Sequence, residues 1–401
     1  MKKLVSVVCG LGLVAGLGFA SPALATDSEG ARSAQGAAEG YTYNLLTGET
    51  DDPRAAAVLA QLDQIDPQWR QKLAERLDSP GEVELLAALQ RAINPEDHQC
   101  GLTPLDAYVE EITADLDEWN IFLLALLGAL DMPSLDALVY GTEADPDYAL
   151  PGDTKAQAKA FRKAQKFWPV ESDDIQLIGM HGEMVIDQDR VERYYEEFYG
   201  YDEADAAELA DLVAEFVLAD PALEGGDHPI FTLNAFAFSA EGETDPFIAT
   251  VPDKIVMGEG IVDATEWMGL GSAGQQAILS HEFAHHVQFE EGLFDSDLPP
   301  NEATRRTELM ADAYASYFSA HRTGLNLRKG VILTVQQSFY NVGDCGFDSP
   351  GHHGTPHQRL RAAEWGADLA IRTQKQGRVI GLDQLLALFE AQLPIIVAPD
   401  A

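Results

Sequence analysis

The chain has few cysteines and few basic residues for its 401 positions. Three cysteines cannot build a disulfide-rich scaffold. Lys and Arg total 26 against 66 Asp and Glu, and the formal net charge of −40 argues against nucleic acid and anionic lipid as partners. The longest apolar run beyond the N-terminus, Ile121 to Leu130, is about half the length that a membrane span needs. We therefore expect no nucleic-acid partner and no membrane span in the mature chain.

The remaining composition, 46% hydrophobic and 23% charged, is that of a globular protein. The first 25 residues differ from the rest, because Lys2 and Lys3 precede an apolar stretch that ends in a small-residue site at Ala23 to Ala25. This arrangement is typical of a secretory signal peptide. It predicts that residues 1–25 are removed and that the protein is exported, to a periplasm or to the medium.

The composition changes again along the mature chain. Small and polar residues predict a flexible leader over 26–50. Apolar residues at helical spacing, as from Ala55 to Leu62, predict a mainly helical N-terminal domain over 51–150. Gly and Pro residues between 141 and 155 indicate a linker. A second domain is expected over 156–395.

The second domain combines strand-like and helical segments. Residues 229–239 and 253–263 are rich in apolar residues and are separated by turn residues, which favours two adjacent, paired strands. Two long helices are expected next, over 272–291 and 301–321. The sequence thus predicts an α+β fold with a small sheet and two long helices.

The first long helix carries His281, Glu282 and His285 in the pattern HExxH. Residues four apart lie on one helix face, so both imidazoles could grip one ion from consecutive turns, with Glu282 beside them. Five-residue patterns also arise by chance, so the motif needs support from its context. His286 points about 100° away around the helix, and we interpret it as a residue of the surface or of a second layer rather than a ligand.

The second long helix supplies acidic partners. Glu308 and Asp312 are four residues apart and can face the histidines together. Two His, one Glu and an open position form the ligand set of a hydrolytic zinc site. Asp312 could accept the far N–H of a ligand histidine. The alternative for both residues is a solvated acidic helix face.

The order of several motifs resembles that of gluzincin metallopeptidases, with the HtpX-like, Oma-like and predicted neutral zinc metallopeptidases of bacteria as the nearest families. The resemblance covers residues 228–370. The motifs are NAFAF (234–238), IVMGEGIVDA (255–264), QQAILSHEFAHHVQ (275–288), ELMADAYA (308–315) and HGTPHQR (353–359).

The resemblance implies a role for each matching residue. His281, His285 and Glu308 would bind one zinc ion per chain, in a zincin-like catalytic domain. Glu282 would be the general base that takes a proton from a zinc-activated water. Asp312 matches the acidic residue four positions after the third ligand. The segment 255–263 matches an edge strand that pairs with an extended protein or peptide substrate.

A late histidine and arginine also match. His353 precedes Arg359 by six residues, as in the family, and is the first candidate for stabilising the oxyanion. Arg359 could contact substrate or hold an acidic residue of the motif in place. The chain has Gly354 where the family often has Pro, and His352 and His357 are additional, so the histidine that approaches the reacting oxygen stays open.

The two cysteines of the mature chain, Cys100 and Cys345, are expected to pair in an oxidising compartment, with two free thiols as the alternative. Such a bridge would tie the N-terminal region to the catalytic part. That region could be a prodomain, a cap over the site or an adaptor.

The leading hypothesis from the sequence is an exported zinc metalloendopeptidase. A non-catalytic secreted protein that retains the fold, and a zinc amidase acting on a non-peptide substrate, are the alternatives. Glu282 argues against the first alternative, because a structural site needs no base at this position. The sequence leaves the oligomeric state open.

Overall fold

The computed structural model describes residues 9–10, 43–44, 49–50, 52–71, 103–243, 246–343, 352–374 and 378–399. Cys100, Cys345 and almost all of the predicted signal peptide lie outside these residues. Apart from short 3-10 and π turns, the elements in chain order are β1 (Cys9–Gly10), β2 (Tyr43–Asn44), β3 (Glu49–Thr50), α2 (Pro53–Ile65), α5 (Pro104–Ile112), α6 (Glu118–Leu126), α7 (Met132–Tyr140), α8 (Thr154–Phe167), β4 (Gln176–Met180), α9 (Gln188–Tyr194), α10 (Glu203–Ala219), β5 (Ala235–Phe238), β6 (Lys254–Gly258), α11 (Glu259–Trp267), α12 (Gly271–Glu290), α13 (Pro300–Ala320), α14 (Lys329–Asn341), α15 (Pro356–Gln374) and α16 (Leu382–Ile396).

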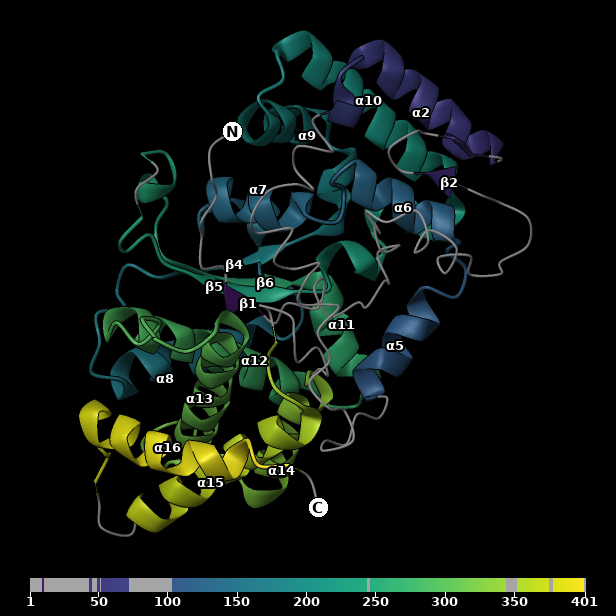
Figure 1. The fold of residues 1–401 in the computed structure, drawn as a ribbon. Coiled ribbons are helices and arrows are strands. Elements are labelled where there is room, and N and C mark those ends of the chain that lie inside the picture. Colours follow the sequence, from purple (N-terminus) through teal and green to yellow (C-terminus); the bar gives the residue numbers. More distant parts are fainter. Residues whose placement is uncertain are drawn as a thin grey trace.

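The fold is α+β and mostly helical, with one small mixed sheet at its centre (Figure 1). The strand order is β1-β5-β6-β4, in which β6 runs parallel to β4 and antiparallel to β5. The two-residue strand β1 pairs antiparallel with the outer edge of β5, with Cys9 opposite Ala237. Strand β6 is therefore an inner strand, and β5 is the strand next to it on the side of β1.

Helices cover both faces of the sheet, which explains why its strands are apolar without alternation (Figure 1). Successive side chains point to opposite faces. Ala235, Ile255 and Met257 join the core beneath α12, α8 and α13, whereas Phe236 and Val256 join the core beneath α7. One face of the sheet thus packs against α8, α12 and α13, which include the HExxH helix, and the other face packs against α7.

The N-terminal helices share a core with the later part of the chain. One hydrophobic cluster combines side chains from α2 and α6 with side chains from α9 and α10, and α2 packs on α10. Helix α7 contacts both β4 and β6. A boundary near residue 150 therefore does not separate two hydrophobic cores.

Helices α12 and α13 are buried around their full circumference over much of their length. All residues from Gly274 to Gln288 and from Thr307 to Ala320 are buried. Helix α12 ends just before Gly292, whose positive φ of 62° suits glycine at a helix C-terminus. Both helix ranges agree with the expectation from sequence to within one residue. Charged residues on these helices must therefore find partners inside the protein.

The structure corrects three sequence-based expectations. The segment 255–263 is not an edge strand, because β6 is paired on both sides and its continuation from Glu259 is helix α11. The expected flexible leader over 26–50 does not hold at its end, since β2 and β3 pair antiparallel. Strand β4 was not expected at all. Among the described residues, no helix combines the length and the apolarity that crossing a membrane requires.

A buried lysine joins the N-terminal helices to the sheet. The ammonium group of Lys254 donates hydrogen bonds to the carbonyl oxygens of Ala137, Leu138 and Gly141, at the end of α7, over 2.5–3.1 Å. The carbonyl of Ala137 also accepts from the backbone N–H of Gly141, and the lysine adds a donor to this and the following carbonyls, so it acts as a cap from outside the helix. Burial lowers the pKa of Lys254 to about 8, so most of the group is charged at pH 7.

We expect Lys254→Met to lower the free energy of unfolding by about 1–3 kcal/mol, because it leaves buried carbonyl groups without a donor. Urea unfolding followed by circular dichroism would measure this loss. Lys155→Met, at an exposed position on α8, is the matched control and should change stability little. Equal stabilities of the two variants would contradict the capping role.

Candidate metal centre

Helix α12 brings the two motif histidines together. His281 and His285 are one turn apart, their Nε2 atoms are 3.1 Å apart, and both side chains are fully buried. The rings meet edge to face, with centroids 4.7 Å apart. Two ring nitrogens thus face the same point, as the spacing in the sequence predicts.

Helix α13 packs against α12 and supplies the third group. Glu308 Oε2 is 3.2 Å from His281 Nε2, and Glu308 Oε1 is 3.4 Å from His285 Nε2. One ligand atom from each of the three residues lies within 4.8 Å of the other two. His281, His285 and Glu308 therefore form a buried group that could hold a metal ion.

His281 contacts Asp312, which in turn is paired with Arg359. Its Nδ1 atom is 2.9 Å from Asp312 Oδ1, which is the contact expected from sequence. Arg359 on α15 in turn donates from Nε and Nη2 to the two oxygens of Asp312, at 2.7 and 2.8 Å. Its Nη2 is also 3.6 Å from Glu308 Oε2. Of the two roles considered for Arg359, this geometry favours holding the acidic residues over contacting substrate.

Gln288 contacts the site and was not found from the sequence. Its side-chain oxygen lies 2.8 Å from His285 Nδ1, and its amide nitrogen donates to the carbonyl of Thr307 at 2.8 Å. The sequence offered one indication of this contact: Gln288 follows His285 by three residues and so lies on the same helix face.

Glu282 has the environment of a group that exchanges a proton. Its carboxylate is fully buried and has no hydrogen-bond partner among the described residues. Burial raises the pKa of Glu282 well above its ordinary value, while the neighbouring His281 charge lowers it. The backbone N–H of Ala237 on β5 also lowers the pKa of Glu282, although the two groups do not form a hydrogen bond. Glu282 therefore lies between the histidines and strand β5.

The other histidines divide into near and distant ones. His353 is largely buried, and its charge lowers the pKa of Glu308, so it lies near the ligand group. His357 packs against the ring of Tyr340, with centroids 5.3 Å apart. His286 is buried and donates from Nε2 to the carbonyl of Lys254 at 2.9 Å, so it belongs to a second layer rather than to the ligands.

The pKa values of the three candidate ligands shift in different directions. Burial lowers the pKa of His281, but Asp312 and Glu308 outweigh burial and raise this pKa to about 9. Burial lowers the pKa of His285. Burial also works against the charge of Glu308, yet the surrounding histidines hold its pKa well below the ordinary value. In the metal-free protein at pH 7, His281 is therefore protonated, and the carboxylates of Asp312 and Glu308 stabilise its positive charge.

These residues fit a divalent metal ion. The donor set of two imidazoles and one carboxylate suits zinc and other first-row transition metals. Both oxygens of Glu282 lack hydrogen-bond partners within the described part of the chain, which is costly in a dry site unless another charge compensates it. His281, His285 and Glu308 could therefore hold a divalent first-row metal ion.

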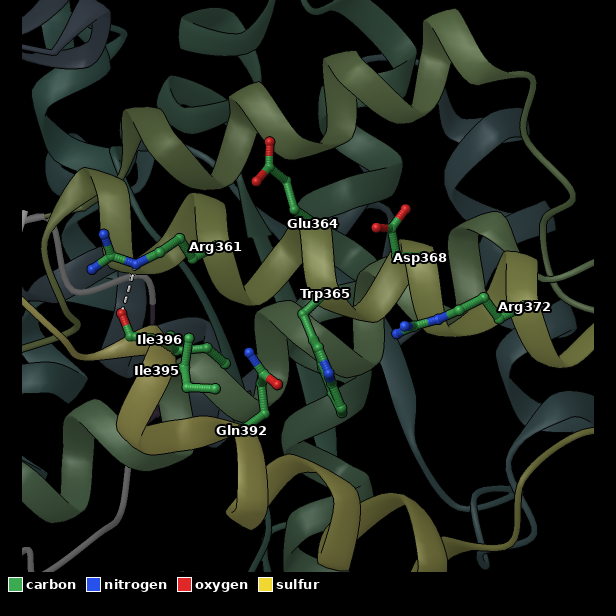
Figure 2. Close-up of a pocket in the computed structure, with 8 residues that line it drawn as sticks. All are labelled: Arg361, Glu364, Trp365, Asp368, Arg372, Gln392, Ile395 and Ile396. Carbon is green, nitrogen blue, oxygen red and sulfur yellow. Dashed lines mark hydrogen bonds between the residues drawn. The ribbon is translucent and has the colours of Figure 1, made fainter.

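A second concave region lies on the outside of the molecule, between α15 and α16. It has a volume of about 340 Å³, and Arg361 there donates to the carbonyl of Ile396 at 2.8 Å (Figure 2). Its lining residues are Arg361, Glu364, Trp365, Asp368, Arg372, Gln392, Ile395 and Ile396. None of the three ligand residues lines it, so this groove is separate from the metal centre.

Comparison with known proteins adds no assignment: no family model, no curated protein and no solved structure matches this chain.

We expect metal binding at pH 7 to release about one proton, because the ion displaces the proton that a pKa of about 9 keeps on His281. Calorimetric titration of the metal-free protein with zinc, in buffers of different ionisation enthalpy, measures this number. The release should fall to half near pH 9 and vanish well above it, where affinity should stop rising. Binding at pH 7 without proton release would contradict the assignment.

Proposed function

We propose that the protein is an exported zinc metalloendopeptidase with a zincin-like catalytic arrangement. The observation that carries this proposal is the pairing of a buried His281–His285–Glu308 group with an adjacent carboxylate, Glu282, that has no hydrogen-bond partner among the described residues. A structural metal site needs no such carboxylate, whereas hydrolysis needs a base at this position.

His281, His285 and Glu308 would hold the zinc ion, which when bound supplies Lewis-acid chemistry that polarises the scissile carbonyl and acidifies water. Glu282 would accept a proton from the attacking water and deliver it to the leaving amine. Its raised pKa suits this role, because a base that must also act as an acid works best near the working pH. Asp312 and Arg359 would hold the ring of His281 in place.

The outer edge of β5 is the proposed place for an extended substrate, in contrast to the segment first expected. Ala237 on this strand lies close enough to Glu282 to influence its pKa, so a peptide paired with β5 would pass beside the base. In the structure, Cys9 and Gly10 occupy this edge. These residues belong to the proposed signal peptide, and its removal on export to the periplasm or medium would leave the edge free for substrate.

The decisive experiment compares the mature protein, starting at Thr26, with its Glu282→Gln variant. Both are loaded with zinc and incubated with a diverse peptide library, and mass spectrometry identifies the cleaved bonds. We expect cleavage by the wild type only, with equal zinc content in both proteins, because the substitution removes the base and leaves the ligands intact. Zinc content is measured by inductively coupled plasma mass spectrometry.

The alternatives predict other results. A non-catalytic binding protein would retain zinc and cleave nothing. An amidase for non-peptide substrates would also leave the library intact but would hydrolyse small amides in a manner that depends on Glu282. Cleavage that persists in Glu282→Gln would contradict the assignment of the base.

We further expect His353→Ala to lower kcat about 100–1000-fold, with smaller changes in KM and zinc content, because it removes a donor to the developing oxyanion. His357→Ala is the control, since that ring packs on Tyr340. Steady-state kinetics on a peptide found in the library screen would measure both. An equal effect of the two substitutions would exclude the donor role of His353.

A further inference from the structure

The side-chain amide of Gln288 is held between two parts of the metal centre. It is fully buried on α12, with its oxygen 2.8 Å from Nδ1 of His285 and its nitrogen 2.8 Å from the carbonyl oxygen of Thr307. An amide offers an acceptor at one end and donors at the other. Both ends of Gln288 are therefore used.

The partner on α13 decides which way the amide faces. The carbonyl of Thr307 can only accept, so the amide nitrogen must face it. The oxygen then faces His285 and can only accept, which requires the proton of that imidazole to sit on Nδ1. The Nε2 lone pair of His285 is left pointing toward His281 and Glu308.

The same amide also sets the position of the third ligand. Thr307 immediately precedes Glu308 on α13, so its carbonyl belongs to the backbone that carries this carboxylate. Through one side chain, α12 is joined to α13 at the height of the metal centre. Orientation of one ligand and placement of another thus depend on a single residue.

The two histidines are supported in different ways. His281 faces a carboxylate, Asp312, whose charge is balanced by Arg359, whereas His285 faces a neutral amide. A second carboxylate at position 288 could accept from His285 but could not donate to Thr307. Only an amide satisfies both contacts without adding negative charge to a buried site that already holds three carboxylates, Glu282, Glu308 and Asp312.

We propose that Gln288 is a positioning residue that fixes the Nδ1–H tautomer of His285 and the approach of Glu308, and thereby sets the affinity of the site for its metal ion. This inference rests on the proposed function only in that both need a metal at His281, His285 and Glu308. Partners of this kind typically change metal affinity 10–100-fold.

The test compares Gln288→Met with a matched substitution on the same helix, Gln275→Met. Gln275 is also fully buried and donates to Glu266 at 2.9 Å. It accepts from the N–H of Asp153 at 2.8 Å and from the side-chain amide of Gln157 at 3.1 Å, and it lies about 20 Å along α12 from Gln288. Both variants lose a buried amide with an acceptor and a donor contact. Only one of them loses a contact to a ligand.

The readouts are zinc affinity, from competition with a chromophoric chelator at pH 7.5, and the thermal stability of the metal-free protein. We expect Gln288→Met to bind zinc about 10–100-fold more weakly and Gln275→Met to bind like the wild type, with similar losses of stability in both. Gln288→Glu keeps an acceptor for His285 and should recover zinc affinity relative to Gln288→Met, although the metal-free protein stays destabilised.

Wild-type zinc affinity in Gln288→Met, or an equal loss in Gln275→Met, would overturn the inference and leave the proposed function standing. A wild-type protein that binds no zinc would overturn both. Should Gln288→Met fail to fold, nitrogen NMR of histidines in the metal-free wild type decides the matter. Protonated Nδ1 in His285 is expected, and protonated Nε2 would overturn the inference.

Discussion

The paired hydrogen bonds from Arg359 to Asp312 are the interaction on which the candidate metal centre depends. They join α15 to α13, and Asp312 continues the contact to His281 on α12. All three side chains are fully buried. A buried carboxylate is tolerable only when its charge is balanced and its oxygens are hydrogen-bonded, which a planar guanidinium does with two parallel bonds. Three helices are thereby held at the distance that the ligands need.

The sequence predicted most of the ligand geometry, because that geometry is largely local. His281 and His285 share one helix, and Glu308 and Asp312 share another, so helical periodicity alone places each pair on one face. The helix ends were predictable as well, since Gly292 stops α12 in a left-handed conformation. The sequence alone could not show that α12 and α13 pack against each other and bring the two pairs together, which the structure shows.

The errors concern contacts between segments distant in the sequence. The sequence favoured one extended segment over 253–263, but β6 ends at Gly258 and the next residues coil into α11. The choice of edge strand could not be read from composition, because both faces of β5 and β6 are buried and both strands are apolar. Gln288 escaped notice for a similar reason, since its role requires the carbonyl of Thr307 on another helix.

The buried ammonium of Lys254 also bears on what the N-terminal region can be. Its three acceptors belong to residues 137–141, and its own carbonyl accepts from His286 on α12. Proteolytic release of the helices before the linker would remove the carbonyl acceptors of the Lys254 ammonium group at the end of α7. It would also expose the face of the sheet that packs against α7. The N-terminal helices thus share their packing with the later part of the chain, and the two halves should unfold together.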